Sequence, residues 1–398
     1  QVYHGCAAGL YDEVYWPIYV EKIGGQPCEY KIRQTLGALE TNLSLVRTFF
    51  PEGDLSQMPL VSKKSDQSWL LNEAGLTLLN TGQPKEGEEL FKRKLEMNVK
   101  ERQYGPVSKG YQNLADLQFR TGELKLGLEN AKKALDASEK AKSKSDNDII
   151  YSKAYLAWIL HLLGKSEEAD KEFRQADELE EKIRGYRLYS HRGVNYANFF
   201  LSIKRTDEAF ELTKQNLEIC KRNNWQNNIS RCHRCLGAIE RIKGKPNEAE
   251  VHLQTALEIA RKVCMPYLEI EALLESGRLY LDMGKHEDAI RDANEALKIC
   301  TGTGFKLYEP EAEVVLGKAY LALNDIKQAK TFARSGYEKA VSMSYRWQEG
   351  DAAHLLGEIY LKMGDNVRAR EWLDKAVECR KEILDPEVKE LERMLEGL

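Results

Sequence analysis

The sequence predicts an all-α protein built as a solenoid of about eight helix-turn-helix repeats, each about 40 residues long. Three observations support this prediction. A glycine or alanine recurs at a nearly constant interval along most of the chain, and each interval holds two stretches of apolar residues at helical spacing. The chain also has only 10 prolines in 398 residues, which argues against long linkers and against an all-β fold.

The recurring small residue lies in the middle of the first helix of each predicted repeat. It occupies eight positions: Gly75, Ala115, Ala157, Ala197, Gly237, Gly277, Gly317 and Gly357. Six of the seven steps between neighbours are 40 residues long, and one is 42. Because each hairpin can bury its apolar face only against its neighbours, this regularity predicts a single stacked array.

Each predicted repeat contains signals for two helices. The first helix is expected to end about seven residues after the small residue, where seven repeats have a residue that tolerates the left-handed backbone: Gly82, Gly122, Gly164, Gly244, Gly284, Asn324 and Gly364. The second helix opens with acidic residues, which are favourable near a helix N-terminus, as in Glu287 and Asp288. An alanine then recurs where the two helices should touch, although the first two repeats have Gly87 and Gly127 there.

The first 68 residues depart from this repeat. The segment 4–23 is similar to the second half of a hairpin, so the first half is expected upstream of Gln1. We expect a further helix over residues 30–50 and a loop over residues 51–68. Residues 1–68 therefore form helices and a loop that lead into the array.

The array itself is expected to cover residues 69–384 and to end in a capping helix over residues 385–398. In the stretch LDPEVKELERMLEGL, Asp385 is suited to the N-cap and Pro386 to the first helical position. A terminal repeat of a solenoid needs such a cap, because its outer face has no neighbour.

The alternation of small and aromatic residues over residues 69–380 resembles the tetratricopeptide repeat (TPR). That resemblance implies a right-handed superhelix whose inner surface is formed by the first helix of each repeat. The usual repeat is about 34 residues long. Repeats of 40 residues therefore imply helices that are longer by most of a turn.

The stretches CAAGLYDEVYWPIYVEKI and LGALETNLSLVRTFFPE resemble the start of the repeat array in bacterial STAND proteins, which are multidomain signal-transduction ATPases. The resemblance implies that this chain is a C-terminal sensor region that binds a partner in its concave groove, and that an ATPase and an effector domain lie upstream. One alternative is a stand-alone adaptor in a protease-linked or CRISPR-linked assembly. Another is a regulator that binds a signalling peptide or a nucleic acid.

Two motifs resemble chemical sites, but each has a structural explanation. Cys232 and Cys235 have the spacing of a metal or redox pair, but no second ligand pair accompanies them, so we expect them to pack between helices. The Gly-Lys-Ser turn at residues 164–166 lacks the glycine that a phosphate-binding loop needs, since Ile159 stands there. We therefore expect no catalytic residues, no cofactor and no metal site.

The inward-facing positions of the first helices predict a partner-binding surface. They lie six and three residues before, and one, four and five residues after, the small residue, and they give eight candidates: Tyr151, Trp158, His161, Asn198, Arg231, Arg234, Arg241 and Arg278. Arginines at this spacing can donate paired hydrogen bonds to carboxylates or phosphates, so the expected partner is a protein or peptide that is acidic or phosphate-bearing. The alternative is that these arginines are solvated or pair with Glu271 and Asp282.

Bulk composition limits the class of protein further. The net charge of -4 gives no general support for nucleic-acid binding. No run of apolar residues approaches the length of a membrane span. The 8 cysteines lack the dense spacing of a disulfide framework, which favours a reducing, cytoplasmic location.

Overall fold

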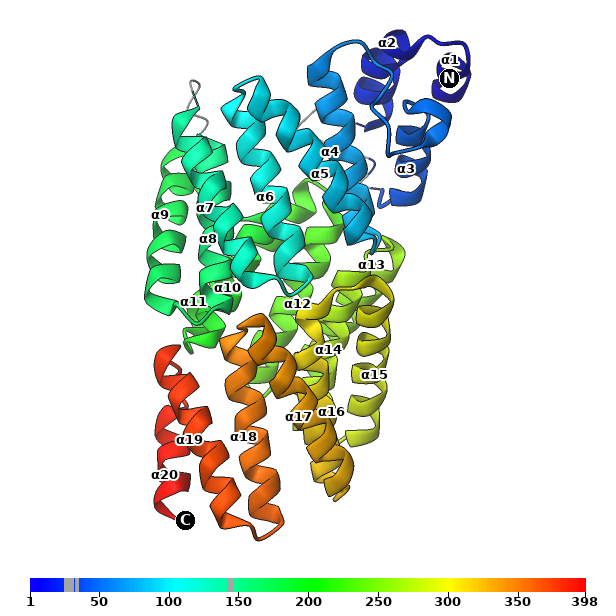
Figure 1. The fold of residues 1–398 in the computed structure, drawn as a ribbon. Helices are drawn as coiled ribbons and strands as arrows, with labels where there is room; N and C mark the ends of the chain where they lie inside the picture. The colour runs from blue at the N-terminus through cyan, green and yellow to red at the C-terminus, as the bar shows by residue number, and fades with distance from the viewer. Residues whose placement is uncertain (25–31, 33–35, 142–145) are drawn as a thin grey trace.

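The computed structural model describes residues 1–24, 32, 36–141 and 146–398. Within these residues the secondary structure is helical, without strands, and consecutive helices pack in pairs (Figure 1). The all-α solenoid predicted from the sequence is confirmed. None of the helices in this part of the chain combines the length and the apolar character that crossing a membrane requires.

Eight hairpins follow one another along the described chain, numbered here as units one to eight. Their helices are α4 (Lys64–Asn80) and α5 (Pro84–Lys100), α6 (Tyr104–Arg120) and α7 (Leu124–Lys140), α8 (Asp146–Leu162) and α9 (Ser166–Arg184), α10 (Ser190–Ser202) and α11 (Thr206–Arg222), α12 (Gln226–Ile242) and α13 (Pro246–Lys262), α14 (Pro266–Asp282) and α15 (His286–Thr303), α16 (Glu309–Ala322) and α17 (Ile326–Met343), and α18 (Arg346–Lys362) and α19 (Asn366–Glu382). A short 3-10 helix, η4 (Lys306–Tyr308), precedes α16.

The small residues lie at close contacts between helices, with the hairpin partner at Gly75, Gly237 and Gly357 and with the next first helix at Gly277 and Gly317. A Cβ atom added at Gly237 would lie 2.6 Å from Cγ of Leu253 on the partner helix, a distance that real Cβ contacts do not show. The equivalent Ala157 is fully buried. Unit four ends its first helix without glycine or asparagine, and Lys204 adopts the left-handed conformation there, with φ of 60°.

The N-terminal segment differs from the prediction. It contains α1 (Val2–Ala7), α2 (Tyr11–Val14), the π-helix η1 (Tyr15–Gly24), α3 (Leu39–Arg47) and the 3-10 helix η3 (Pro51–Gly53). The predicted half-hairpin over residues 4–23 is therefore broken into short pieces, in keeping with Pro17, which has no N–H to donate to a regular α-helix.

Two boundaries in this segment were also predicted wrongly. The helix expected over residues 30–50 begins only at Leu39, and the part of that prediction on residues 30–31 and 33–35 lies outside the described residues. The loop expected over residues 51–68 contains the start of α4 at Lys64. The segment packs on α4 through aromatic rings, since Tyr19 contacts Trp69 with ring centres 5.9 Å apart.

The C-terminal helix α20 (Val388–Glu396) caps the array, but it starts later than predicted. Pro386 is outside the helix, and Asp385 is not its N-cap. The Asp385 carboxylate instead accepts a hydrogen bond from the backbone N–H of Glu387, at 2.9 Å, and pairs with Arg380. The negative charge of Asp385 therefore neutralises a buried arginine of unit eight.

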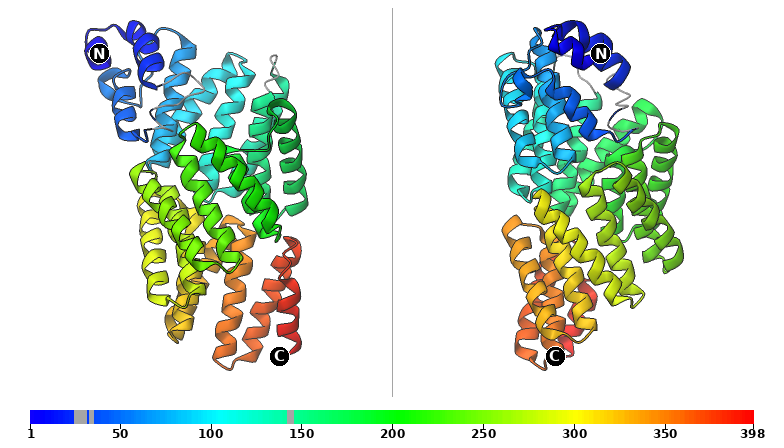
Figure 2. Two further views of the ribbon diagram at one scale, coloured as in Figure 1. Left: turned by 180° about the vertical axis from the view of Figure 1, so that it is seen from behind. Right: turned by 90° about the vertical axis from the view of Figure 1, so that its right-hand side faces the viewer.

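The superhelix turns back on itself, so that units one to three contact units six to eight. The Trp347 indole N–H donates to the backbone carbonyl of His161 at 2.8 Å, and the Ser166 hydroxyl donates to the carbonyl of Ile383 at 2.7 Å. In Figures 1 and 2 the C-terminal hairpins lie directly below the ends of the N-terminal ones. This contact closes one turn of the solenoid around an interior space.

Candidate functional site

A cavity of about 600 Å³ lies inside this closed turn. Side chains from α6, α8, α10, α12, α14, α16 and α18 line it, together with residues from η4 and from the C-terminal end of the array. The volume is within the roughly 300–1,000 Å³ typical of ligand pockets. It is therefore large enough for a small molecule or a short peptide segment, but not for a folded partner.

Seven of the eight candidate residues line this cavity. They are Trp158, His161, Asn198, Arg231, Arg234, Arg241 and Arg278. Tyr151 does not line it: its ring packs under the guanidinium of Arg192, whose central carbon lies 3.8 Å from the ring centre, and beside the ring of His191. One predicted position therefore lies in the packing between α8 and α10.

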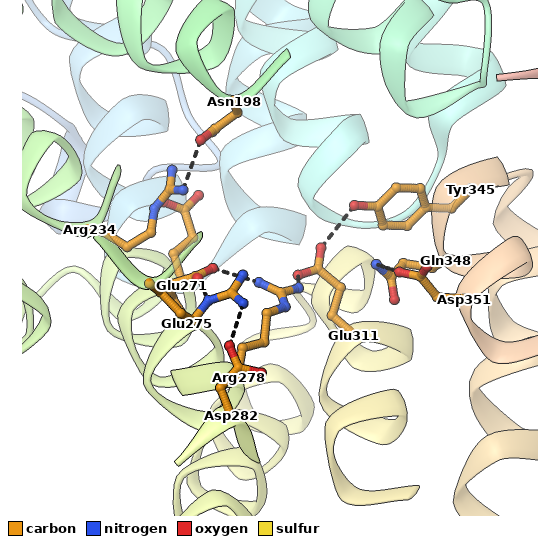
Figure 3. Close-up of polar contacts among 11 residues, drawn as sticks. Asn198, Arg234, Glu271, Glu275, Arg278, Asp282, Glu311, Tyr345, Gln348 and Asp351 are labelled. Atoms are coloured by element: carbon orange, nitrogen blue, oxygen red, sulfur yellow. Dashed lines mark hydrogen bonds and ion pairs between the residues drawn. The ribbon is translucent and has the colours of Figure 1, made fainter. Parts of the chain in front are cut away.

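Three of the four candidate arginines belong to an ion-pair network along the inner face, and Arg241 and Arg278 form its centre (Figure 3). Arg241 donates to Glu275 at 2.7 Å and to Asp282 at 2.8 Å. Arg278 donates to the other oxygen of Glu275 at 3.0 Å and to Glu311 at 2.7 Å. Burial raises the pKa of Glu275, but Arg241 and Arg278 outweigh this effect and lower it to about 2.

The network continues in both directions from this centre. Arg234 donates to the side-chain oxygen of Asn198 at 2.9 Å and lies 3.9 Å from Glu271. At the other end, the Tyr345 hydroxyl donates to Glu311 at 2.9 Å. These contacts join unit four to five, five to six, six to seven and seven to eight, so they fix the spacing of the first helices.

These contacts change the interpretation of the arginine row. Arg241 and Arg278 are not free to bind an external anion, because carboxylates of the neighbouring repeats already neutralise them. The alternative weighed from the sequence, pairing with Glu271 and Asp282, describes Arg234 and Arg241. Seven basic and seven acidic side chains line the cavity, which has no net charge overall.

One end of the cavity combines cations with tyrosine rings. We call it the aromatic end and define it by six residues: Arg120, Tyr155, His191, Arg231, Tyr267 and Tyr308. Here the central guanidinium carbons of Arg120 and Arg231 lie 3.9 Å and 5.0 Å from the ring centre of Tyr267. Burial raises the pKa of Tyr155 and Tyr308 well above the usual value, so both stay protonated and can donate hydrogen bonds.

A second region of the cavity is formed by Trp158, His161 and Trp347. The His161 ring lies 5.3 Å from that of Trp158 and 4.9 Å from that of Trp347, centre to centre. Burial lowers the pKa of His161 to about 3, so this histidine is neutral at physiological pH. This region offers an apolar surface with one neutral polar group.

Several buried polar atoms around the cavity have no hydrogen-bond partner among the described residues. Seven of them belong to lining residues: Arg120 Nη1, His161 Nδ1, His191 Nε2, Arg231 Nε, Arg234 Nε, Gln348 Oε1 and Arg380 Nε. Buried polar groups in folded proteins are nearly always hydrogen-bonded, and those that are not need an explanation. These atoms have almost no accessible surface, so a ligand would reach them only after their side chains turn towards the cavity.

Of the acidic side chains that line the cavity, only Glu271 was named from the sequence, as a pairing partner of the arginines, although the sequence carries a signal for two others. Glu271, Glu311 and Asp351 lie six residues before their small residues, the same register position as Arg231. Applying that offset to units six to eight would have found them. Trp347 has no such signal, because it reaches the cavity only through closure of the superhelix.

Cys232 and Cys235 lie away from the cavity, in the packing between α11 and α12. Both side chains are fully buried, and Cys235 contacts the hydroxyl of Thr213 at 3.3 Å. Burial raises the pKa of both thiols, which disfavours the thiolate form that metals and oxidants require.

Comparison with solved structures shows the same type of fold. The chain is similar to a Rap protein complexed with competence and sporulation factor, with 14% identity, a TM-score of 0.63 and coverage of 89% of this chain and 96% of that one. It is also similar to NprR in complex with its cognate peptide NprX, with 14% identity, a TM-score of 0.54 and coverage of 82% and 97%. A STAND protein with a tetratricopeptide repeat sensor from Pyrococcus horikoshii has 20% identity, a TM-score of 0.49 and coverage of 83% and 50%.

Sequence comparison gives a family assignment for the repeats. A clustered mitochondria protein homolog from Ajellomyces capsulatus is 33% identical over 185 residues, which is 44% of this chain but only 15% of that protein. Three family models described as tetratricopeptide repeat match residues 155–183, 228–302 and 350–387. These matches fall on units three, five, six and eight, and the hairpin geometry extends through all eight units. The chain therefore contains tetratricopeptide repeats.

Proposed function

We propose that this chain is a protein-interaction module whose cavity binds a short segment of a peptide or protein partner. The observation that supports this most strongly is the cavity of about 600 Å³, which is lined by both polar and aromatic side chains. Peptide backbones supply both donors and acceptors at short intervals, and the tryptophans near His161 offer a surface for an apolar side chain. Two of the similar solved proteins hold a factor or a cognate peptide, which favours the same use of this fold.

A second, more specific proposal concerns the larger protein to which this module belongs. We propose that it is the sensor region of a STAND-type ATPase, supported by the resemblance of residues 1–50 to the start of such arrays. Ligand binding in the cavity would then control an upstream ATPase domain, and this chain would contribute no catalytic step. The coding sequence upstream of Gln1 tests this directly: a phosphate-binding loop is expected there, and its absence would favour the adaptor.

The binding proposal is tested by filling the cavity. Asn195 lines it, and an Asn195→Trp substitution places an indole inside the space that a ligand needs. Purified protein would be used to select binders from a randomised pentapeptide pool, and affinities would be measured by calorimetry. We expect the wild type to enrich specific peptides, and Asn195→Trp to bind them at least tenfold more weakly.

A matched control separates loss of the cavity from general damage. Val251 is 63% exposed on α13, outside the cavity lining, so Val251→Trp adds the same side chain elsewhere. This variant is expected to bind like the wild type, and both variants should keep the helical circular dichroism signal. Equal binding by Asn195→Trp and the wild type, or no enrichment by either protein, would refute the proposal.

A further inference from the structure

A buried lysine lies outside the cavity, between the helices of units one and two. Lys94 on α5 is only 4% exposed. Its Nζ atom donates a hydrogen bond to the side-chain oxygen of Asn72 on α4, at 2.6 Å. No acid among the residues that the structure describes pairs with Lys94, and its charged neighbour Lys109 on α6 is a second cation. A buried cation without an acid is costly, so the uncharged amine is favoured here.

These surroundings hold much of the Lys94 amine in its neutral form near physiological pH. Burial and the charge of Lys109 lower the pKa of Lys94 from 10.5 to about 7. At pH 7.4 roughly half or more of the Lys94 amines are then unprotonated, against about one in a thousand for an exposed lysine. Only the unprotonated amine has the lone pair that attacks an electrophile. Lys94 is therefore a far better nucleophile than a lysine on the surface.

Burial also limits which electrophile reaches this amine. The close-packed interior admits a small, uncharged molecule when side chains fluctuate, whereas a bulky or charged reagent is excluded. Carbon dioxide is both small and uncharged. It adds to an unprotonated amine without a leaving group, so no further catalytic residue is needed.

We propose that Lys94 is a carbon dioxide-binding site, at which its amine forms a carbamate. The lone pair of Nζ forms a bond to the carbon of carbon dioxide. One C=O π bond breaks and its electron pair becomes the negative charge of the carboxylate, while one Nζ proton is released to solvent. The reaction neither consumes nor supplies an oxidant or a reductant.

The groups around Lys94 suit the product as well as the amine. The carbamate is negatively charged, so Lys109 changes from a repelling neighbour into an attracting one. The Asn113 side-chain amide donates to the same oxygen of Asn72 as Lys94 does, at 2.6 Å, so it is a second donor close to Nζ. A charged acceptor strengthens the hydrogen bonds that it accepts.

This site is separate from the proposed peptide site. Lys94, Asn72 and Lys109 do not line the cavity. Loss of the carbamate is therefore expected to leave peptide binding unchanged, and failure of peptide binding would leave this inference in place.

Trapping the carbamate tests the proposal. The purified protein is held at pH 7.4 with dissolved carbon dioxide, and triethyloxonium ion converts any carbamate into a stable ethyl ester. Mass spectrometry with peptide fragmentation then locates the ester. Lys92 is the matched control in the same molecule: it is exposed on the same helix, and its hydrogen bonds to Glu88 and Glu89 raise its pKa.

We expect the ester on Lys94, in an amount that rises with carbon dioxide concentration, and at least tenfold less of it on Lys92. Lys94→Met, which removes the amine from a side chain of similar length, should show no ester at this position. Lys109→Met should reduce the yield on Lys94, because it removes the cation that lowers the pKa of the amine and attracts the carbamate.

Urea unfolding gives a second readout, because a ligand that binds the folded state better than the unfolded chain stabilises the folded state. Carbon dioxide should raise the urea midpoint of the wild type at constant pH and ionic strength, but not that of Lys94→Met. Equal labelling of Lys92 and Lys94, or no label on Lys94 in buffer saturated with carbon dioxide, would overturn the proposal. Equal shifts in the urea midpoints of the wild type and Lys94→Met would do the same.

Discussion

Opposite charges alternate along the inner face of units five to seven, and their pairing explains why the sequence predicted the site only in part. The repeat register correctly indicates which side chains point away from the hairpin packing, as with Arg234 and Arg241. It does not show what each cation meets in the next repeat. Glu275 is the clearest example, because it binds two arginines from a position that was not considered.

The ion pairs of Glu275 with Arg241 and Arg278 predict how the free energy of unfolding depends on pH. Burial raises the pKa of Glu275, but Arg241 and Arg278 lower it from the ordinary 4.5 to about 2. Because the folded protein binds this proton less readily than the unfolded chain, the contribution of Glu275 is present above pH 4.5. It is lost as the pH falls towards 2, and it amounts to about 3 kcal/mol.

Urea unfolding of the wild type and of Glu275→Gln across pH 6 to 2 measures this contribution. The free energy of unfolding of the wild type should exceed that of the variant at pH 6, and the difference should shrink by about 3 kcal/mol on going to pH 2. The ion-pair account is wrong if the difference between the two proteins is the same at every pH.

At the scale of helices, the repeat spacing predicted the hairpins because each first helix must approach its partner at one small residue. Gly237 and Gly277 show how strictly this holds. A Cβ at Gly237 would meet Cγ of Leu253 on the partner helix at 2.6 Å. A Cβ at Gly277 would lie 3.1 Å from a terminal methyl group of Val315 on α16, the first helix of the next unit, and 3.7 Å from the carbonyl of Ala289 on its own partner helix. The sequence shows both as small residues and cannot rank them, because the ranking depends on the side chains that the neighbouring helices place there.

Alanine substitution tests that ranking. Gly237→Ala should lower the free energy of unfolding, because overpacking usually costs about 1–3 kcal/mol. Part of this cost is offset, since alanine is more stable than glycine in a helix by roughly 0.5–1 kcal/mol. Gly277→Ala is the matched control and should be close to neutral, since a methyl group can shift by a few tenths of an ångström. Equal effects of both variants on urea unfolding would contradict the close approach described for Gly237.

At the scale of the whole molecule, closure of the superhelix was beyond sequence reasoning. Periodicity predicts which repeats are neighbours, but the rotation from one repeat to the next determines whether distant repeats meet. The hydrogen bond from Ser166 to the carbonyl of Ile383 joins residues 217 positions apart, and neither residue type predicts such a contact. Arg231 was predicted from the repeat register, but its meeting with Arg120 at the ring of Tyr267 and the contribution of Trp347 depend on this closure and could not be predicted.

A crystal structure of the protein with a peptide selected from the randomised pool tests the central claim most directly. We predict difference electron density inside the cavity between α10 and α14. Peptide density on the outer surface of the second helices, with the cavity unchanged, would contradict the proposed function.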